Sequence, residues 1–344
     1  MTNTLQIQTS LLEWYDASAR QLPWRSIKNP YWTWVSEIML QQTQVKTVIP
    51  YFETWIQKFP TLQTLAEASE EHVMKYWAGL GYYRRARMLH QGAKHVHAKW
   101  KGQIPSDIQT LQTIPGIGRY TAGAIASIAF EQRASILDGN VMRVLSRLFL
   151  IKQPIDDPKT IAKLWRFAEQ ILPDQRIGDF NQALMELGAL VCTPEKPACH
   201  ECRLTSVCQA FQKQKTHQVP VKKIKTNYQK ITEYAAVIQY KDQLLIRKQK
   251  PGEKWAGLYA FPISSNTDFL SHIPQVSVPK QTALKIRYAF TRYQITAHVF
   301  LISLSTKKLP LEKTLHAAWV PKSKVKHLAF PSPHQKILKA LAHV

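Results

Sequence analysis

The stretch TIPGIGRYTAGAIASIAF, residues 113–130, decides the fold, because it sets a short glycine loop between two predicted helices. Residues 107–114 have the pattern of a short helix, and Asp107 is a residue type that caps a helix start. Pro115 ends this helix, since proline has no amide hydrogen to donate. Small and apolar residues then recur with helical spacing and predict a second helix. The stretch therefore predicts a helix–hairpin–helix over about residues 107–130.

Two glycines, Gly116 and Gly118, form the tip of this hairpin. Glycine accepts left-handed backbone conformations and lets a ligand approach the backbone closely. The second helix begins beside them at Arg119, where the first amides of a helix lack intrahelical acceptors and attract anions. Short glycine motifs also arise by chance, so the glycines alone are equally compatible with a packing role.

The composition indicates a polyanionic partner. Among 344 residues, 46 Lys and Arg outnumber 23 Asp and Glu, which gives a net charge of +23. Residues 217–344 alone hold 21 basic against 5 acidic residues, and such an excess is typical of nucleic-acid binding. Membrane-surface binding is the competing explanation, but the sequence shows no long apolar run and no signal peptide. We therefore expect a soluble, cytoplasmic, DNA-associated protein.

All four cysteines lie within 17 residues, at Cys192, Cys199, Cys202 and Cys208. Disulfides are typical of small secreted chains, and this chain is long and shows no secretion signal. Zinc sites usually consist of two closely spaced cysteine pairs. The uneven spacing C-x6-C-x2-C-x5-C instead favours an iron–sulfur cluster in the loop 192–208.

The hydrophobic pattern divides the chain. Residues 1–212 are mostly helical by pattern, and residues 213–230 are basic and poor in core residues, which is typical of a linker. In residues 231–344 the pattern changes to alternation: residues 233–249 predict two strands around a turn, and residues 294–305 predict another strand. The sequence thus predicts a multidomain chain, with an all-α helix–hairpin–helix domain followed by a smaller α+β domain.

Several motifs together resemble the helix–hairpin–helix DNA glycosylases: the PGIGRYTA hairpin, LDGNVMRVLSR at 137–147 and the cysteine cluster. LPWR at 22–25, SEIMLQQTQV at 36–45 and GLGYYRRARML at 79–89 narrow the resemblance to the MutY-type adenine DNA glycosylases. KWAGLYAFP at 254–262 resembles that family's MutT-like, or Nudix, C-terminal domain. The resemblance covers nearly the whole chain. It implies a monomeric base-excision-repair enzyme with a [4Fe–4S] cluster, which flips adenine out of double-stranded DNA when it is mispaired with 8-oxoguanine or G.

The resemblance also implies the catalytic groups. Glu37 would protonate adenine, and Asp138 would stabilise the cationic sugar, a division of labour that glycoside hydrolases also use. Without the resemblance, Glu37 would count as part of a solvated polar stripe, and Asp138 as a helix cap. Burial under the flipped base is expected to raise the pKa of Glu37. The supporting residues are Tyr120 and Asn140 as positioning groups, with Trp24 and Arg25 in the adenine pocket.

Tyr120 distinguishes this chain from an alternative class, the bifunctional pyrimidine glycosylase/lyases of the endonuclease III type. Those enzymes resemble this chain but carry lysine at the matching place, where it forms a Schiff base. Tyrosine cannot form that imine, so we expect a monofunctional glycosylase.

The remaining implied contacts are with DNA. Gln42 and Tyr82 resemble wedges that enter the base stack as the base leaves it. The amides of Gly116 and Gly118 would hold a phosphate, with a monovalent cation at the hairpin. The basic residues that we expect to meet phosphates are Arg84, Arg85, Arg87, Arg143 and Arg147.

A hairpin in the second domain is the expected lesion reader. The family presents Phe-Ser-His there, and the aligned residues are Phe290, Thr291 and Arg292. Thr291 keeps the hydroxyl, whereas Arg292 replaces a titratable ring with a permanent cation that has no acceptor. The alternative is a shifted alignment, in which this strand only packs.

Two further functions compete with this assignment, and the sequence argues against the first, so we expect the second domain to bind rather than hydrolyse. A nucleotide pyrophosphohydrolase acting through the second domain would need a Glu-rich, metal-binding helix, but Asp268 is the only carboxylate between residues 262 and 290. A non-enzymatic iron–sulfur DNA-binding protein differs from the enzyme only in lacking Glu37 and Asp138 in catalytic geometry.

Overall fold

The computed structural model describes residues 2–222, 228–267, 282–306 and 315–341. Its internal contacts divide the chain into two units. The first unit comprises Met1–Glu67 with Met88–Lys225, and the second comprises Ala68–Arg87 with Thr226–Val344. The first unit therefore continues past residue 212 into the segment that the sequence marks as a linker.

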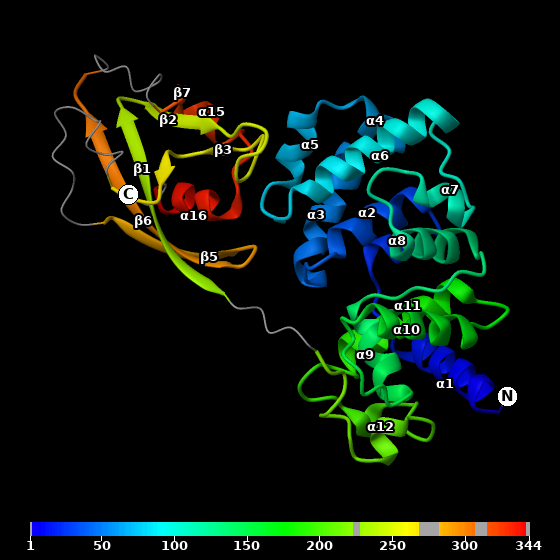
Figure 1. The fold of residues 1–344 in the computed structure, drawn as a ribbon. Coiled ribbons are helices and arrows are strands. Elements are labelled where there is room, and N and C mark those ends of the chain that lie inside the picture. Colours follow the sequence, from blue (N-terminus) through cyan, green and yellow to red (C-terminus); the bar gives the residue numbers. More distant parts are fainter. Residues whose placement is uncertain (1, 223–227, 268–281, 307–314, 342–344) are drawn as a thin grey trace. The chain divides into compact units, whose positions relative to one another are not determined.

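Helices dominate the chain up to residue 222 (Figure 1), which confirms the helical pattern. They are α1 Thr2–Ser18, α2 Pro30–Leu40, α3 Val45–Lys58, α4 Leu62–Glu67, α5 Glu70–Trp77, α6 Arg84–Trp100, α7 Ile108–Gln112, α8 Arg119–Ala124, α9 Gly139–Leu148, α10 Pro158–Gln170, α11 Ile177–Leu190 and α12 Gln209–Gln212. Large side chains such as Trp34, Trp55 and Phe180 are completely buried in the first unit. This burial supplies the main stabilisation of that unit.

The helix–hairpin–helix forms as predicted. The side chain of Asp107 accepts a hydrogen bond from the Thr110 amide at 2.7 Å and so caps α7. Gly116 has φ +85°, and a Cβ atom there would lie 2.8 Å from Met88 Cβ, so this glycine is required by the fold. Gly118, the N-cap of α8, has φ −90° and ψ 179°, and a Cβ would meet nothing within 4 Å. The fold itself therefore does not require a glycine at residue 118.

The close approach of α9 and α11 positions the candidate site. A Cβ atom on Gly188 of α11 would lie 2.7 Å from Asn140 Cβ of α9, so only glycine permits this separation. Met185 and Glu186, on the same helix, are thereby held beside the start of α9. Helix α11 also contacts α1.

The second unit contains a mixed sheet, whose described strands are β1 Gln229–Tyr240, β2 Gln243–Lys248, β3 Tyr259–Ala260, β4 Ile263–Ser264, β5 Leu284–Phe290, β6 Tyr293–Leu304 and β7 Ala318–Pro321. The order is β3-β2-β1-β6-β5, with β4 paired to β1 and β7 to β2. The predicted two strands around a turn are β1 and β2, and the further predicted strand is β6, which pairs with β1 in parallel.

Alternate residues of β1 enter two separate cores, as the two-residue period of a strand requires. Ala235 and Val237 pack in the core that also contains Ile337 of α16, Ser332–Leu341. Ala236 and Ile238 pack in a second core. Both faces of β1 are therefore buried. The short helix α15, Lys322–Val325, contacts β7 and β2.

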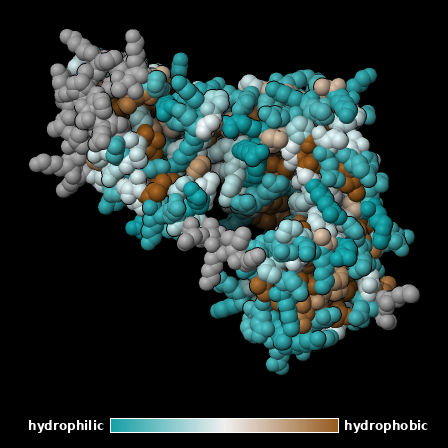
Figure 2. All heavy atoms as spheres, viewed as in Figure 1, coloured by the Kyte–Doolittle hydropathy of each residue, from teal (hydrophilic) through white to brown (hydrophobic). Residues whose placement is uncertain are grey.

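The face of the molecule drawn in Figure 2 is strongly polar. Hydrophilic side chains cover most of the face drawn in Figure 2, in keeping with the net charge of +23. Among the described residues, no helix has both the length and the apolar character needed to span a bilayer.

Candidate active site

The first unit contains a cleft of about 1100 Å³ that gathers most of the predicted catalytic and pocket residues. Glu37 comes from α2, Tyr120 from α8 and Asp138 from the residue before α9. The other predicted site residues on its lining are Trp24, Arg25, Gln42, Asn140 and Arg143. Side chains that are distant in the sequence thus face one space.

Glu37 is a buried acid in this cleft, with an exposed fraction of 5%. Its neighbours Thr33 and Ser36 are buried as well, so the polar stripe of α2 faces the protein interior instead of solvent. Burial raises the pKa of Glu37 to about 7, and the nearby charge of Asp138 adds to this rise. The Tyr120 hydroxyl donates a hydrogen bond to Glu37 Oε2, which opposes part of the rise.

Asp138 caps α9, as expected, and at the same time faces the cleft. Its Oδ1 accepts from the Val141 amide at 2.7 Å, and its Oδ2 accepts from Asn140 Nδ2 at 2.9 Å. Burial raises the pKa of Asp138, while these hydrogen bonds lower it. Arg143 Nη2 donates to Asn140 Oδ1 at 2.8 Å and to the Gly188 carbonyl at 2.7 Å. This chain of contacts fixes which end of the Asn140 amide faces Asp138.

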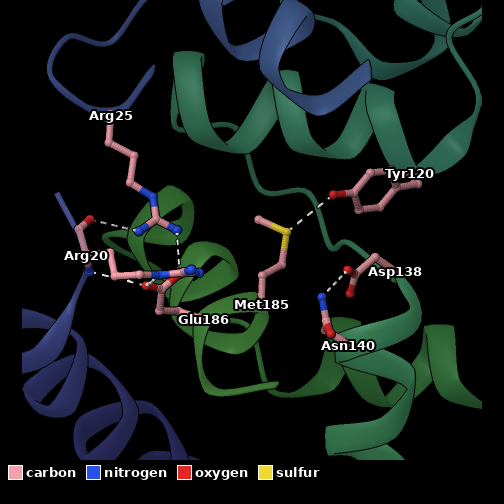
Figure 3. A network of polar contacts seen from close by, with 7 residues as sticks. All are labelled: Arg20, Arg25, Tyr120, Asp138, Asn140, Met185 and Glu186. Carbon is pink, nitrogen blue, oxygen red and sulfur yellow. Dashed lines mark hydrogen bonds and ion pairs between the residues drawn. The ribbon is translucent and has the colours of Figure 1, made fainter. Parts of the chain in front are cut away.

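Glu186 is a cleft residue that the sequence reasoning missed, together with Arg20. Arg20 Nε lies 2.6 Å from Glu186 Oε1, and Arg25 Nη2 lies 3.0 Å from Oε2. Figure 3 shows both guanidinium groups converging on this carboxylate, with Met185 between it and Tyr120. Burial would raise the pKa of Glu186, but the two arginines outweigh it and hold that pKa below its ordinary value. A lone acid in the apolar run ALMELGAL, residues 183–190, was the available signal.

The predicted base wedges have unusual backbones. Gln42 has φ 56° and Tyr82 has φ 48°, in the left-handed region that favours glycine. Each such residue costs roughly 1–3 kcal/mol, and such residues concentrate at functional sites. Tyr82 is 60% exposed, and Gln42 lies on the cleft lining. Trp24, by contrast, is buried and packs edge-on against Phe52, with ring centroids 5.4 Å apart.

The three arginines at the start of α6 differ in their surroundings. Arg84 is exposed. Arg85 stacks over the Trp77 ring at 5.2 Å, and burial lowers its pKa to about 10. Arg87 forms an ion pair with Glu70 at 2.9 Å. Their phosphate contacts stay a prediction.

Arg147 does not have the role that we expected, because its side chain is only 2% exposed. The predicted phosphate contact of Arg147 is therefore wrong. Its Nη1 lies 3.3 Å from Cys192 Sγ and 2.6 Å from the Thr193 carbonyl, and its Nη2 lies 2.8 Å from the Pro194 carbonyl. Arg147 instead hydrogen-bonds to the beginning of the cysteine loop and holds it in place.

The four predicted metal-binding cysteines line one small, mostly apolar pocket, namely Cys192, Cys199, Cys202 and Cys208. No three His, Cys, Asp or Glu side chains of the described residues are arranged to hold a single metal ion. Four sulfurs lining one pocket are a ligand set that suits a [4Fe–4S] cluster, and four cysteines are also a ligand set for tetrahedral zinc.

The predicted lesion reader forms the tip of a β-hairpin. Phe290 pairs with Tyr293, so Thr291 and Arg292 make a two-residue turn between β5 and β6. Both turn residues are exposed, and Thr291 has φ 51°. Asp268, the acid weighed for a pyrophosphohydrolase, lies outside the described residues.

An ionic group surrounded by aromatic rings supports this hairpin. Lys254 Nζ lies 2.8 Å from Glu233 Oε1 and 2.8 Å from the Tyr288 hydroxyl. The same ammonium lies 4.3 Å from the ring centroid of Trp255 and 5.1 Å from that of Phe290. Charge–ring contacts of this kind hold the end of β5 in place.

Comparisons with known proteins agree with this arrangement. Residues 35–170 match the HhH-GPD superfamily of base excision DNA repair proteins, and residues 233–340 match the NUDIX domain. A solved thermostable thymine-DNA glycosylase shares 26% identity and a TM-score of 0.57, covering 62% of this chain and 98% of that one. An endonuclease III–DNA complex, at 23% identity and a TM-score of 0.52, covers 61% and 97% and shows the same helical fold.

Relatives by sequence are adenine DNA glycosylases. The human protein is 51% identical over 61% of this chain. The chain spans about two fifths of the length of the mouse, human and rat relatives. The Buchnera aphidicola protein from Schizaphis graminum is 34% identical and matches over 96% of both chains. The chain therefore belongs to the adenine DNA glycosylase family.

Proposed function

We propose that this protein is a monofunctional DNA glycosylase that hydrolyses the N-glycosidic bond of adenine mispaired with 8-oxoguanine or G. The observation that carries the proposal is the buried Glu37, hydrogen-bonded to Tyr120 in the cleft that Asp138 also lines. A non-enzymatic DNA-binding protein has no need to bury two carboxyl groups facing one cleft, because burial of ionisable groups costs stability.

Glu37 acts as the general acid. With a pKa of about 7 it keeps a proton near neutrality, which an exposed glutamic acid would lose. Tyr120 occupies Oε2, so the proton lies on Oε1 and is delivered to N7 of the flipped adenine. The bond between C1′ and N9 then breaks, and neutral adenine leaves. General acid catalysis of this kind contributes about 10²–10⁴-fold.

Asp138 stabilises the positive charge that develops on the sugar, as its counterpart does in other glycoside hydrolyses. Its fixed position as the cap of α9 means that no reorganisation is required when the charge appears. Water then adds to C1′, its proton passes to the ionised Glu37, and an abasic site results. Asn140, held by Arg143, orients Asp138.

The adenine pocket lies between Trp24 and the arginine pair on Glu186. Glu186 holds Arg20 and Arg25 by three contacts of 2.6–3.0 Å, so these long side chains cannot fold over the base site. Trp24 supplies an apolar wall, and a flipped base can be recognised there by contacts to its edge and faces.

Double-stranded DNA binds through sequence-independent contacts as well. The hairpin at Gly118 offers the first amides of α8 to a phosphate, and a side chain at residue 118 would fill that approach.

A [4Fe–4S] cluster on Cys192, Cys199, Cys202 and Cys208 supplies structural order to its loop. Thr291 and Arg292 at the hairpin tip read 8-oxoguanine, with two hydrogen bonds worth roughly 1–3 kcal/mol.

One assay tests the proposal: single-turnover adenine release from duplexes with A opposite 8-oxoguanine, G, C or T. We expect fast release for the first two and strand breakage only after alkali. Release of adenine from no duplex would refute the activity. Borohydride trapping on DNA at the rate of base loss would contradict the monofunctional assignment and indicate an amine nucleophile.

A further inference from the structure

We propose that residues 216–222, which lie within the predicted basic linker, are a fixed wall of the cleft and that Lys222 binds a DNA phosphate there. The inference rests on the proposed function, because it assigns one further contact to the same bound duplex. The sequence marks this segment as a connector, but four structural observations place it in the site.

Buried Arg147 fastens the segment to the first unit. Its Nε donates to the Thr216 carbonyl at 3.1 Å and to the Val219 carbonyl at 3.0 Å. The same guanidinium holds the Thr193 and Pro194 carbonyls of the cysteine loop. One buried, charged side chain therefore joins the linker to the cysteine loop through hydrogen bonds to backbone carbonyls of both segments.

Backbone pairing and burial fix the segment independently. The Ile155 amide donates to the Val221 carbonyl at 2.9 Å, within a parallel bridge between Pro154 and Val221. Val219 is only 3% exposed. An unattached linker shows neither paired backbone nor a buried valine. The segment is thus part of the first unit, which extends to Lys225.

The fixed segment contributes to the cleft lining. Pro220 and Lys222 lie on the same lining as Glu37 and Asp138, and Pro194 of the cysteine loop joins them there. Lys222 itself is exposed. The Arg147 contacts therefore set the position of two adjacent pieces of one wall.

Charge favours a phosphate as the ligand of Lys222. Five basic residues line the cleft, and its three arginines already hydrogen-bond to protein acceptors. Lys46 and Lys222 have no ion-pair partner within the described parts of the chain. A flexible, unpaired ammonium beside a site for flipped nucleotides matches the backbone of the strand, which carries one negative charge per nucleotide.

The test is the salt dependence of DNA binding. The probe is a duplex with 8-oxoguanine opposite a 2′-fluorinated adenosine, which resists cleavage. Loss of one phosphate contact lowers the slope of log K against log salt by about 0.9. We expect this decrease for Lys222→Ala, and no change for the matched control Lys213→Ala, because Lys213 is exposed and does not line the cleft.

Two outcomes would overturn the proposal. An unchanged slope for Lys222→Ala, in a protein that still releases adenine, removes the phosphate contact and leaves the proposed function intact. Exchange of the Ile155 amide hydrogen at the rate of an unstructured peptide would show that residues 216–222 are not fixed against the first unit. If the unmodified protein neither binds the duplex nor releases adenine, the proposed function fails as well.

Discussion

Two buried glutamates that line one cleft have opposite electrostatics. Glu37 on α2 and Glu186 on α11 are 5% and 1% exposed. The pKa of Glu37 is raised to about 7, whereas that of Glu186 is lowered. Burial acts in the same direction on both, so the difference arises from their partners.

The partners explain the two outcomes. Glu186 receives two guanidinium groups within 3.0 Å, and hydrogen bonds to cations strongly favour an ionised carboxyl. Glu37 receives one neutral hydroxyl from Tyr120 and the unfavourable charge of Asp138. A single cleft thus holds a carboxylate that stays ionised and binds two arginines, and a carboxyl group that can donate a proton near neutrality.

The largest expected effect comes from removing the proton. Glu37→Gln should decrease single-turnover adenine release by about 10³-fold, because an amide cannot protonate N7. DNA affinity should stay within a few-fold of the unmodified protein. Glu53→Gln, at an exposed glutamate of α3, is the control and should be neutral. Near-normal adenine release by Glu37→Gln would show that Glu37 is not the general acid. The difference between Glu37 and Glu186 would then have no role in catalysis.

Most cleft residues could be predicted from the sequence, but their burial could not. The helix–hairpin–helix and Asp138 as a cap depend on local signals, namely Pro115, two glycines and an acid before a helix. The burial of Glu37 depends on how α2 packs against α8, which is a property of tertiary structure. From periodicity alone, the polar side of α2 would face solvent.

Arg147 and Glu186 are residues whose positions and partners could not be predicted from the sequence. Both are charged residues inside otherwise apolar helical patterns, and surface exposure is the usual outcome for such residues. Their partners come from distant segments: Arg147 meets carbonyls of the cysteine loop and the linker, and Glu186 meets two arginines near the N-terminus. Local sequence reasoning cannot find such partners, because the contacts join residues 45–166 positions apart.

A second prediction concerns stability. The folded-state pKa of Glu37, about 7, exceeds its unfolded value near 4.5, so the native state binds more protons between these values. Its contribution is therefore fully present below pH 4.5 and is lost as the pH rises through 7. Relative to Glu37→Gln, the unmodified protein should lose about 2 kcal/mol between pH 5 and pH 8.

This prediction is measured by urea unfolding of both proteins at each pH, because the difference between them cancels the other ionisable groups. A constant difference across this range would mean that Glu37 has an ordinary pKa in the folded protein. The contrast with Glu186 would then disappear.

The pH dependence of catalysis gives the third prediction. Glu37 must be protonated to act, so single-turnover adenine release should be constant below its pKa and decrease about tenfold per pH unit above about 7. The measurement is the rate constant at saturating protein from pH 5.5 to 9. Strand cleavage by alkali after quenching is a separate step and does not affect the profile. A rate that increases with pH across this range would indicate a general base instead.

The smallest effect tests whether the two glutamates are electrostatically connected. Arg25 bonds to Glu186 and also lowers the pKa of Glu37. In Glu186→Gln the charge of Arg25 is no longer neutralised, so its effect on Glu37 should increase. The midpoint of the pH–rate profile should therefore move below that of the unmodified protein, by less than about one pH unit for a charge acting through an effective dielectric of about 20.

The control for this shift is Glu169→Gln, which removes the partner of Arg119, an ion pair that does not line the cleft. Its midpoint should equal that of the unmodified protein. The midpoint is independent of the maximal rate, so a general loss of activity in Glu186→Gln does not obscure the result. A midpoint that stays in place or moves upward would show that Arg25 moves away from Glu37 once the Glu186 carboxylate is removed. Glu186 would then act by positioning Arg25, and not by neutralising its charge.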